Sequence, residues 1–220
     1  MKDLREMTVT EMTHTLWSDA PAPGGGSMSA LAGGLAAGLA GMVANLSQSA
    51  KYEAVREEMA DIAARMEELY KQLLLEMQRD TDSFSLYMAA LAMPKATEEE
   101  KTARRDAMQA GLKAAAETPL GVAQAIVPVF EVLERVIRVG NPNAVTDALV
   151  GTMMARTGIL GALFNVKINL GGIKDEAYVQ AMQEKVRTLE IAALEGERRV
   201  LALSEIASGV ASYAPAEMKE

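Results

Sequence analysis

The feature that most constrains this chain is a triple glycine followed by a long uncharged segment. The stretch Pro21-Ala22-Pro23-Gly24-Gly25-Gly26-Ser27 leads into residues 28–46, none of which is charged. Eleven of those 19 residues are Gly, Ala or Ser, so other helices could approach the segment closely. Glycines let another group approach the backbone amides, and Ser27 is a good N-cap residue. A glycine-rich loop at a helix N-terminus presents free N–H groups that suit an anion.

Simpler interpretations of this stretch stay open at the level of sequence. The triple glycine also suits a tight turn without a ligand. It is followed by no Gly-Lys-Ser/Thr and does not match GxGxxG after a strand, so neither common nucleotide-binding loop is indicated. The uncharged segment is near the lower length limit of a membrane span, but its Gly/Ala-rich composition favours a buried helix in a soluble bundle. Charged residues crowd the preceding segment, which argues against a signal peptide.

The composition narrows the classes of function. Half of the 220 residues are apolar, and good helix formers dominate. The net charge of −8 argues against a nucleic-acid binder that relies on phosphate neutralisation. Without cysteine, the chain has no disulfide framework, thiol nucleophile or zinc–thiolate site, which fits a cytoplasmic protein. The single histidine, His14, cannot form a multi-histidine metal site, and we predict no metal centre.

The apolar spacing predicts an all-α, up-and-down helical bundle in one domain, residues 1–220. Helices are expected over residues 4–17, 28–46, 51–93, 98–117, 120–139, 144–165 and 175–212. Pro119 is expected near the start of one helix, and Asn143 is expected to cap another. No segment has a convincing strand pattern. Two helices of roughly forty residues, at about 1.5 Å per residue, would overshoot a compact monomer, so we expect a homodimer or a larger assembly.

Several polar residues do not follow from helix building. Asn141, Asp147, Asn165 and Asn169 lie in or beside apolar stretches. Asn165 and Asn169 are four residues apart and would share one helix face. Two amides that point into a core need backbone or ligand partners, and a structural role is the simpler interpretation. For Asp147, an acid that complements the dipole at a helix N-terminus is the simpler interpretation.

The same residues carry a resemblance to a known family. Residues 21–32, Met42-Val43-Ala44-Asn45-Leu46 and residues 161–170 resemble the cyclodeaminase domain of formiminotransferase-cyclodeaminase. The free-standing methenyltetrahydrofolate cyclohydrolases belong to the same family. The resemblance continues through Phe84, residues 93–95, Gly140-Asn141 and Asp147. It implies an all-helical, dimeric protein that binds tetrahydrofolate derivatives.

Three positions depart from the family pattern. Lys51 is the nearest candidate for the family's lysine, in a stretch that is one residue shorter. Gln78 stands where the first of two acids is expected, and Asp80 matches the second. Gly41 replaces the cysteine of some bifunctional enzymes, so that cysteine cannot be essential here.

The resemblance also implies roles for individual residues. Asp147 is expected to be the principal acid–base group, in a place where burial could raise its pKa. Lys51 is expected to hold a folate carboxylate or to stabilise anionic charge. Asn165 and Asn169 are expected to hydrogen-bond the pterin or to orient Asp147. The full expected substrate-binding set is Gly24, Gly25, Gly26, Ser27, Asn45, Asp80, Asn141, Asn165 and Asn169.

Two reactions at one carbon atom are compatible with these residues. The first expectation is a cyclodeaminase, which converts 5-formiminotetrahydrofolate to 5,10-methenyltetrahydrofolate and ammonia. The alternative is a cyclohydrolase, which interconverts the 5,10-methenyl and 10-formyl forms. Both need proton transfer from the nucleophile and to the leaving nitrogen, without a metal or a tightly bound cofactor. A non-catalytic helical binding protein on the same scaffold is a third possibility. The expected partners are the folate substrate and a second copy of the chain, with no nucleic acid and no membrane.

Overall fold

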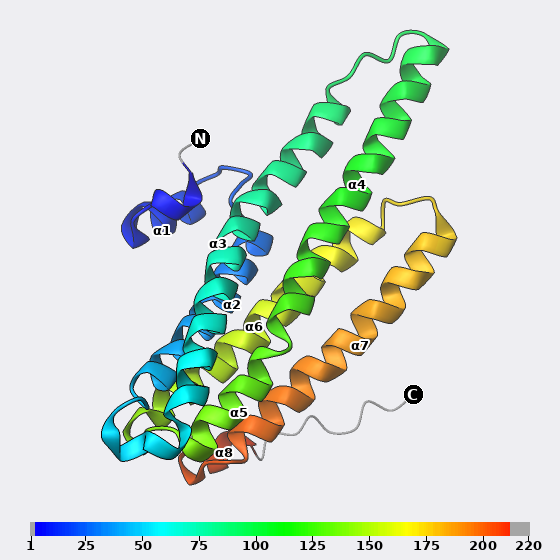
Figure 1. Ribbon diagram of the computed structural model, residues 1–220. Coiled ribbons are helices and arrows are strands. Elements are labelled where there is room, and N and C mark those ends of the chain that lie inside the picture. The colour runs from blue at the N-terminus through cyan, green and yellow to red at the C-terminus, as the bar shows by residue number, and fades with distance from the viewer. Residues whose placement is uncertain (1–2, 212–220) are drawn as a thin grey trace.

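The computed structural model describes residues 3–211, which fold into helices without any strand (Figure 1). The α-helices are α1 (Val9–Trp17), α2 (Gly25–Asn45), α3 (Arg56–Leu91), α4 (Glu98–Ile126), α5 (Val129–Val139), α6 (Val145–Leu170), α7 (Glu176–Leu201) and α8 (Ser208–Ala211). Short 3-10 turns are η1 (Leu4–Glu6), η2 (Ala50–Val55), η3 (Pro142–Ala144) and η4 (Glu205–Ala207). The all-α prediction is therefore confirmed.

Helix α2 lies in the middle of the bundle and packs against α3 and α6, while α4 packs against the same two helices. The α2 and α6 backbones approach closely where Gly33 meets Gly158. A Cβ atom built on Gly158 would lie 3.0 Å from the backbone nitrogen of Gly33. The small residues of α2 are thus explained by close helix packing.

Two segments, Gly25–Asn45 and Pro142–Leu170, are long and apolar enough to span a membrane by length and composition. In the bundle, 61% and 50% of their most apolar windows are buried, so packing between helices uses much of this apolar surface.

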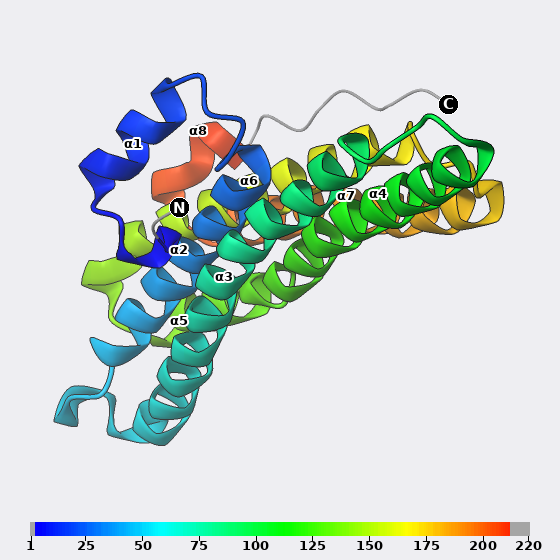
Figure 2. The ribbon, with the colours of Figure 1, turned by 90° about the horizontal axis from the view of Figure 1, so that it is seen from above.

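Helices α3 and α4 continue well past the N-terminal end of α2, as the two ribbon views show (Figures 1 and 2). Together they form an arm beyond the part of the bundle that contains α2. The first turn of α2 is therefore placed at the base of this arm.

Several predicted helix ends are wrong, each for a local reason. α3 begins at Arg56 rather than at Lys51, because the preceding residues form the 3-10 turn η2, in which Tyr52 has non-helical dihedrals. α6 continues past Asn165 to Leu170, and its N-cap is Ala144. Asn143 is not that cap; Asn141 instead caps η3 by accepting the backbone N–H of Asn143. α7 ends at Leu201, and Ser212, the predicted end, lies outside the described residues.

The expected break near Pro119 is also absent, because α4 runs through this proline to Ile126. A proline inside a helix removes one N–H and leaves the carbonyl four residues earlier without its usual partner. That carbonyl belongs to Ala115, and its replacement partner comes from the candidate site described next.

Candidate active site

The N-terminal end of α2 lies against a carboxyl group of α3. A Cβ atom built on Gly26 would lie 2.2 Å from Oδ1 of Asp80, so any side chain at position 26 would displace this carboxyl. The Ser27 hydroxyl donates to Oδ2 of Asp80 at 2.9 Å and lies 3.2 Å from the hydroxyl of Thr81. The N-cap residue is Gly24, which has no side chain, so the prediction that Ser27 is the N-cap is wrong. A backbone hydrogen bond from Ser27 also reaches Asp80, so the capping acceptor comes from α3.

Two opposing effects act on the Asp80 carboxyl. Burial raises its pKa above the ordinary value of 3.8, and the hydrogen bonds from Ser27 pull the pKa in the opposite direction, with burial the larger effect. A carboxyl that is easier to protonate can give and take a proton closer to neutral pH. Perturbed pKa values of this kind are common at catalytic groups, which makes Asp80 the candidate general acid–base of this site.

Helix α6 brings Asn165 to the same place. A Cβ atom built on Gly25 would lie 3.4 Å from Nδ2 of Asn165, and this Nδ2 donates to the carbonyl of Gly161 at 2.9 Å. Among the described residues, no group donates a hydrogen bond to Oδ1 of Asn165 or of Asn169. The amide oxygen of Asn165, whose side chain faces Gly25, and that of Asn169, one turn further along α6, could therefore accept hydrogen bonds from a ligand.

Asn169 supplies the partner that Ala115 lacks. Its Nδ2 donates to the Ala115 carbonyl at 2.9 Å and to the Asn165 carbonyl at 2.8 Å. The first bond replaces the one that Pro119 cannot make within α4. Asn169 thus ties α4 to α6 beside the site, a structural contact of the kind that the simpler interpretation anticipated.

We predict that Asn169→Leu lowers the free energy of unfolding by about 1–3 kcal/mol, because it leaves the partly buried carbonyl of Ala115 without a donor. In a Pro119→Ala background, residue 119 regains the N–H that bonds Ala115. The cost of Asn169→Leu should then shrink by about 1 kcal/mol in a double-mutant cycle measured by urea unfolding. Equal costs in both backgrounds would contradict this account of Asn169.

The other predicted site residues lie at the opposite end of α2. Asp147 precedes Asn165 by 18 residues on α6, about 27 Å at 1.5 Å per residue. The prediction that Asn165 or Asn169 orients Asp147 is therefore wrong within one chain.

Asn141 lies beside the end of α2, where its backbone N–H donates to the Ser47 hydroxyl at 2.8 Å and its side-chain amide donates to the Leu46 carbonyl at 3.4 Å. Lys51 follows in η2, with its ammonium 5.4 Å from the centre of the Tyr52 ring.

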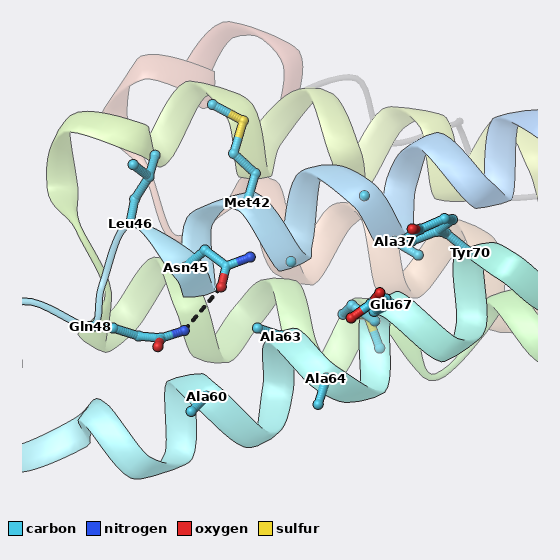
Figure 3. A pocket seen from close by; sticks show the side chains of 13 residues that line it. Ala37, Met42, Asn45, Leu46, Gln48, Ala60, Ala63, Ala64, Glu67 and Tyr70 are labelled. Carbon is cyan, nitrogen blue, oxygen red and sulfur yellow. Dashed lines mark hydrogen bonds between the residues drawn. The ribbon is translucent and has the colours of Figure 1, made fainter.

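Asn45 lines a separate hollow between α2 and α3 of about 690 Å³ (Figure 3). Its Oδ1 accepts from Nε2 of Gln48 at 3.1 Å, and Glu67 and Tyr70 line the same hollow. None of the other predicted site residues lines it. Within one chain the predicted residues thus form two groups, one at each end of α2.

The sequence interpretation missed two members of the Asp80 group. Thr81 is buried and contacts Ser27, and the carbonyl of Ala115 is a backbone atom that no side-chain motif reports. Thr81 could have been found from its position next to Asp80 on a buried helix face. The Ala115 carbonyl could have been found from Pro119, since an internal proline always releases the carbonyl four residues earlier.

A sequence model described as formiminotransferase-cyclodeaminase matches residues 8–188 of the chain. The chain belongs to this family. The predicted family resemblance is confirmed, and the match covers the triple glycine, Asp80 and both asparagines of α6.

Individual members of the formiminotransferase-cyclodeaminase family are similar over most of this chain. A methenyltetrahydrofolate cyclohydrolase of Methylorubrum extorquens is 34% identical over 83% of this chain and 87% of its own length. A formimidoyltransferase-cyclodeaminase of Gallus gallus is 36% identical over 84% of this chain, but the match spans only 34% of that longer protein. The crystal structure of formiminotetrahydrofolate cyclodeaminase from Thermotoga maritima matches with a TM-score of 0.81 and 28% identity, over 94% of this chain and 98% of that one.

Proposed function

We propose that this protein is a formiminotetrahydrofolate cyclodeaminase whose acid–base group is Asp80. The observation that carries the proposal is a carboxyl with a raised pKa, held by Ser27 against the glycine loop at the N-terminus of α2. The family membership and the similar fold of the Thermotoga maritima cyclodeaminase support the same reaction class. This assignment moves the principal role from Asp147 to Asp80.

In the proposed reaction, the formimino nitrogen of the substrate is protonated, and N10 attacks the formimino carbon to form the new C–N10 bond. The Asp80 carboxylate takes the proton from N10 and passes it to the amino nitrogen of the tetrahedral intermediate. The bond from carbon to that nitrogen then breaks, and ammonia leaves with the electron pair. The product is 5,10-methenyltetrahydrofolate, and Asp80 returns to its starting state. Ser27 holds the carboxyl in place, and the amide oxygens of Asn165 and Asn169 accept N–H groups of the pterin. These steps require neither a metal nor a bound cofactor.

The test is an absorbance assay at the methenyl chromophore combined with ammonia detection. Appearance of the chromophore with stoichiometric ammonia from 5-formiminotetrahydrofolate supports the proposal. If neither this substrate nor preformed methenyltetrahydrofolate changes, the protein is a binding protein on this scaffold and the proposal fails.

The second candidate is methenyltetrahydrofolate cyclohydrolase, favoured by the similarity to the Methylorubrum extorquens enzyme over 87% of that protein. Here Asp80 would take a proton from water as the water oxygen attacks the methenyl carbon, and it would pass that proton to N5. The N5–carbon bond would then break as the hydroxyl of the intermediate loses its proton to solvent, which leaves the formyl group on N10. Loss of the chromophore from preformed methenyltetrahydrofolate, with no activity on the formimino compound, would decide for this reaction.

We further propose that two copies pair through uncharged stripes on α2 and α6. Exposed apolar side chains recur on one face of each helix, and the two helices pack side by side. The stripes consist of Leu35 and Met42 on α2 with the C-cap residue Leu46, and of Val150, Met153, Phe164 and Ile168 on α6. Exposed apolar side chains gathered on one face favour an interaction site.

Such a dimer could also bring Asp147 into the site. Residue 156 is midway between Asp147 and Asn165, so antiparallel α6 helices that cross near it would place each Asp147 level with the other chain's Asn165. The separation of about 27 Å within one chain would then be bridged by symmetry. In this proposal Asp147 keeps an acid–base role, as the resemblance implies, but it acts in the partner's site beside Asp80.

A further inference from the structure

The buried stripe of α3 continues past the helix that covers it. Met66 and Leu73 face α2, where Cβ atoms built on Gly41 and Gly33 would lie 3.3 and 3.2 Å from them. Asp80 is the next residue at this seven-residue spacing, and it faces Gly26. Because α2 begins at Gly25, none of its residues lies beyond Asp80 to cover the next turns of α3.

Two large apolar side chains occupy those uncovered turns. Phe84 and Met88 follow Asp80 by four and eight residues, so they share its face of α3. Phe84 is 36% exposed and Met88 is 45% exposed, whereas Leu73 and Met77 lower on the same face are 0% and 2% exposed. This apolar strip is therefore open immediately above the proposed acid–base group.

Helix α4 does not close this side of α3. It meets α3 at Tyr87, where a Cβ atom built on Gly111 would lie 3.1 Å from the Tyr87 Cα. Ser83 faces the same helix through its 3.0 Å contact with the hydroxyl of Thr118. Phe84 and Met88 lie on the other flank of α3, next to the position that α2 would occupy if it were longer.

We propose that the aminobenzoyl ring of the folate substrate lies along α3 on Phe84 and Met88. This inference rests on the proposed function, which places the reacting carbon at Asp80. The aminobenzoyl ring is bonded directly to N10, and Phe84 lies four residues, about 6 Å, along α3 from Asp80. The two faces of the ring are apolar. The aromatic ring of Phe84 and the thioether of Met88 can therefore pack against them.

The polar pterin belongs on the other side of the reacting carbon. Its N–H groups match the amide oxygens of Asn165 and Asn169, which come from α6. The glutamate carboxylates would then point along the α3–α4 arm, away from the acidic group at its base. The ring and the pterin thus each have a surface of matching chemistry.

The test compares Phe84→Ala with Leu86→Ala. Leu86 is 63% exposed, and its position two residues along places it about 200° around α3 from Phe84. Phe84→Ala should raise KM roughly 10- to 100-fold, the loss expected for one buried aromatic contact, with a much smaller change in kcat. Phe84→Tyr should restore KM, and Leu86→Ala should leave it unchanged.

Fragment inhibition separates ring contact from a general structural effect. Phe84→Ala should weaken inhibition by p-aminobenzoylglutamate by the same factor as KM and leave inhibition by a tetrahydropterin unchanged. Equal weakening of both fragments, or an unchanged KM in a wild-type-like fold, would overturn the inference. If wild-type protein turns over neither folate substrate, the proposed function fails instead, so the two failures are distinguishable.

Discussion

Replacing Asp80 by Asn is expected to lower kcat by roughly 10²–10⁴-fold, the usual contribution of a general acid–base group. Asn keeps the size of the side chain and can still accept the hydrogen bond from Ser27, but it cannot take a proton from N10. The matched control is Asp82→Asn, since Asp82 is exposed on the same helix and, among the described residues, its side chain accepts a hydrogen bond only from Gln78. Near-normal turnover by Asp80→Asn would remove Asp80 from the mechanism.

The pH dependence of the free energy of unfolding distinguishes a folded Asp80→Asn variant from a misfolded one. Because burial raises the Asp80 pKa, the folded protein holds this proton more tightly than the unfolded chain. The associated stability is fully present below the ordinary pKa of 3.8 and is lost as pH rises through the folded value. Asp80→Asn should therefore gain stability relative to wild type over that pH range and stay at least as stable at neutral pH. Urea unfolding at acidic and neutral pH measures the difference. A variant that is less stable at neutral pH would indicate that the carboxylate is held favourably.

Mixing two inactive variants is expected to restore activity if Asp147 acts across a dimer. Asp80→Asn and Asp147→Asn would each disable both sites of their own homodimer. In a mixed dimer, one site contains both substitutions and the other contains none. Random pairing of equal amounts should therefore give about a quarter of wild-type activity, because half of the dimers are mixed and each has one intact site.

Three results would contradict the shared site, and each is specific. Near-normal activity of Asp147→Asn alone would remove Asp147 from the mechanism. An inactive mixture of two inactive variants, after confirmed subunit exchange, would place both residues in one chain's site or outside it. A monomer in analytical ultracentrifugation would exclude the dimer itself. Leu35→Glu is the companion variant, because a charge within the α2 stripe should prevent pairing while leaving the fold of the chain intact.

Periodicity was sufficient to predict helices at α3 and α7, because each buries residues at regular helical spacing. The three- and four-residue spacing in residues 55–91 predicted the helix α3 although not its start, and the small uncharged residues of α2 predicted a helix that its neighbours approach closely. The ends were less predictable, since they depend on partners distant in sequence. Ser27 has the composition of an N-cap, yet the structure uses the Asp80 carboxyl, 53 residues away, to accept from the first turn of α2.

By itself the sequence determined the helical class, the family motifs and the residue types available for proton transfer. The tertiary structure decided which of those residues meet: Asp80 and Asn165 at the triple glycine, and Asp147 about 27 Å away along α6. The physical reason is that helical periodicity fixes the face of each residue but not its height relative to a neighbouring helix. That height is set by glycine contacts such as Gly33 with Gly158 and by the Asn169 bond to the carbonyl that Pro119 releases.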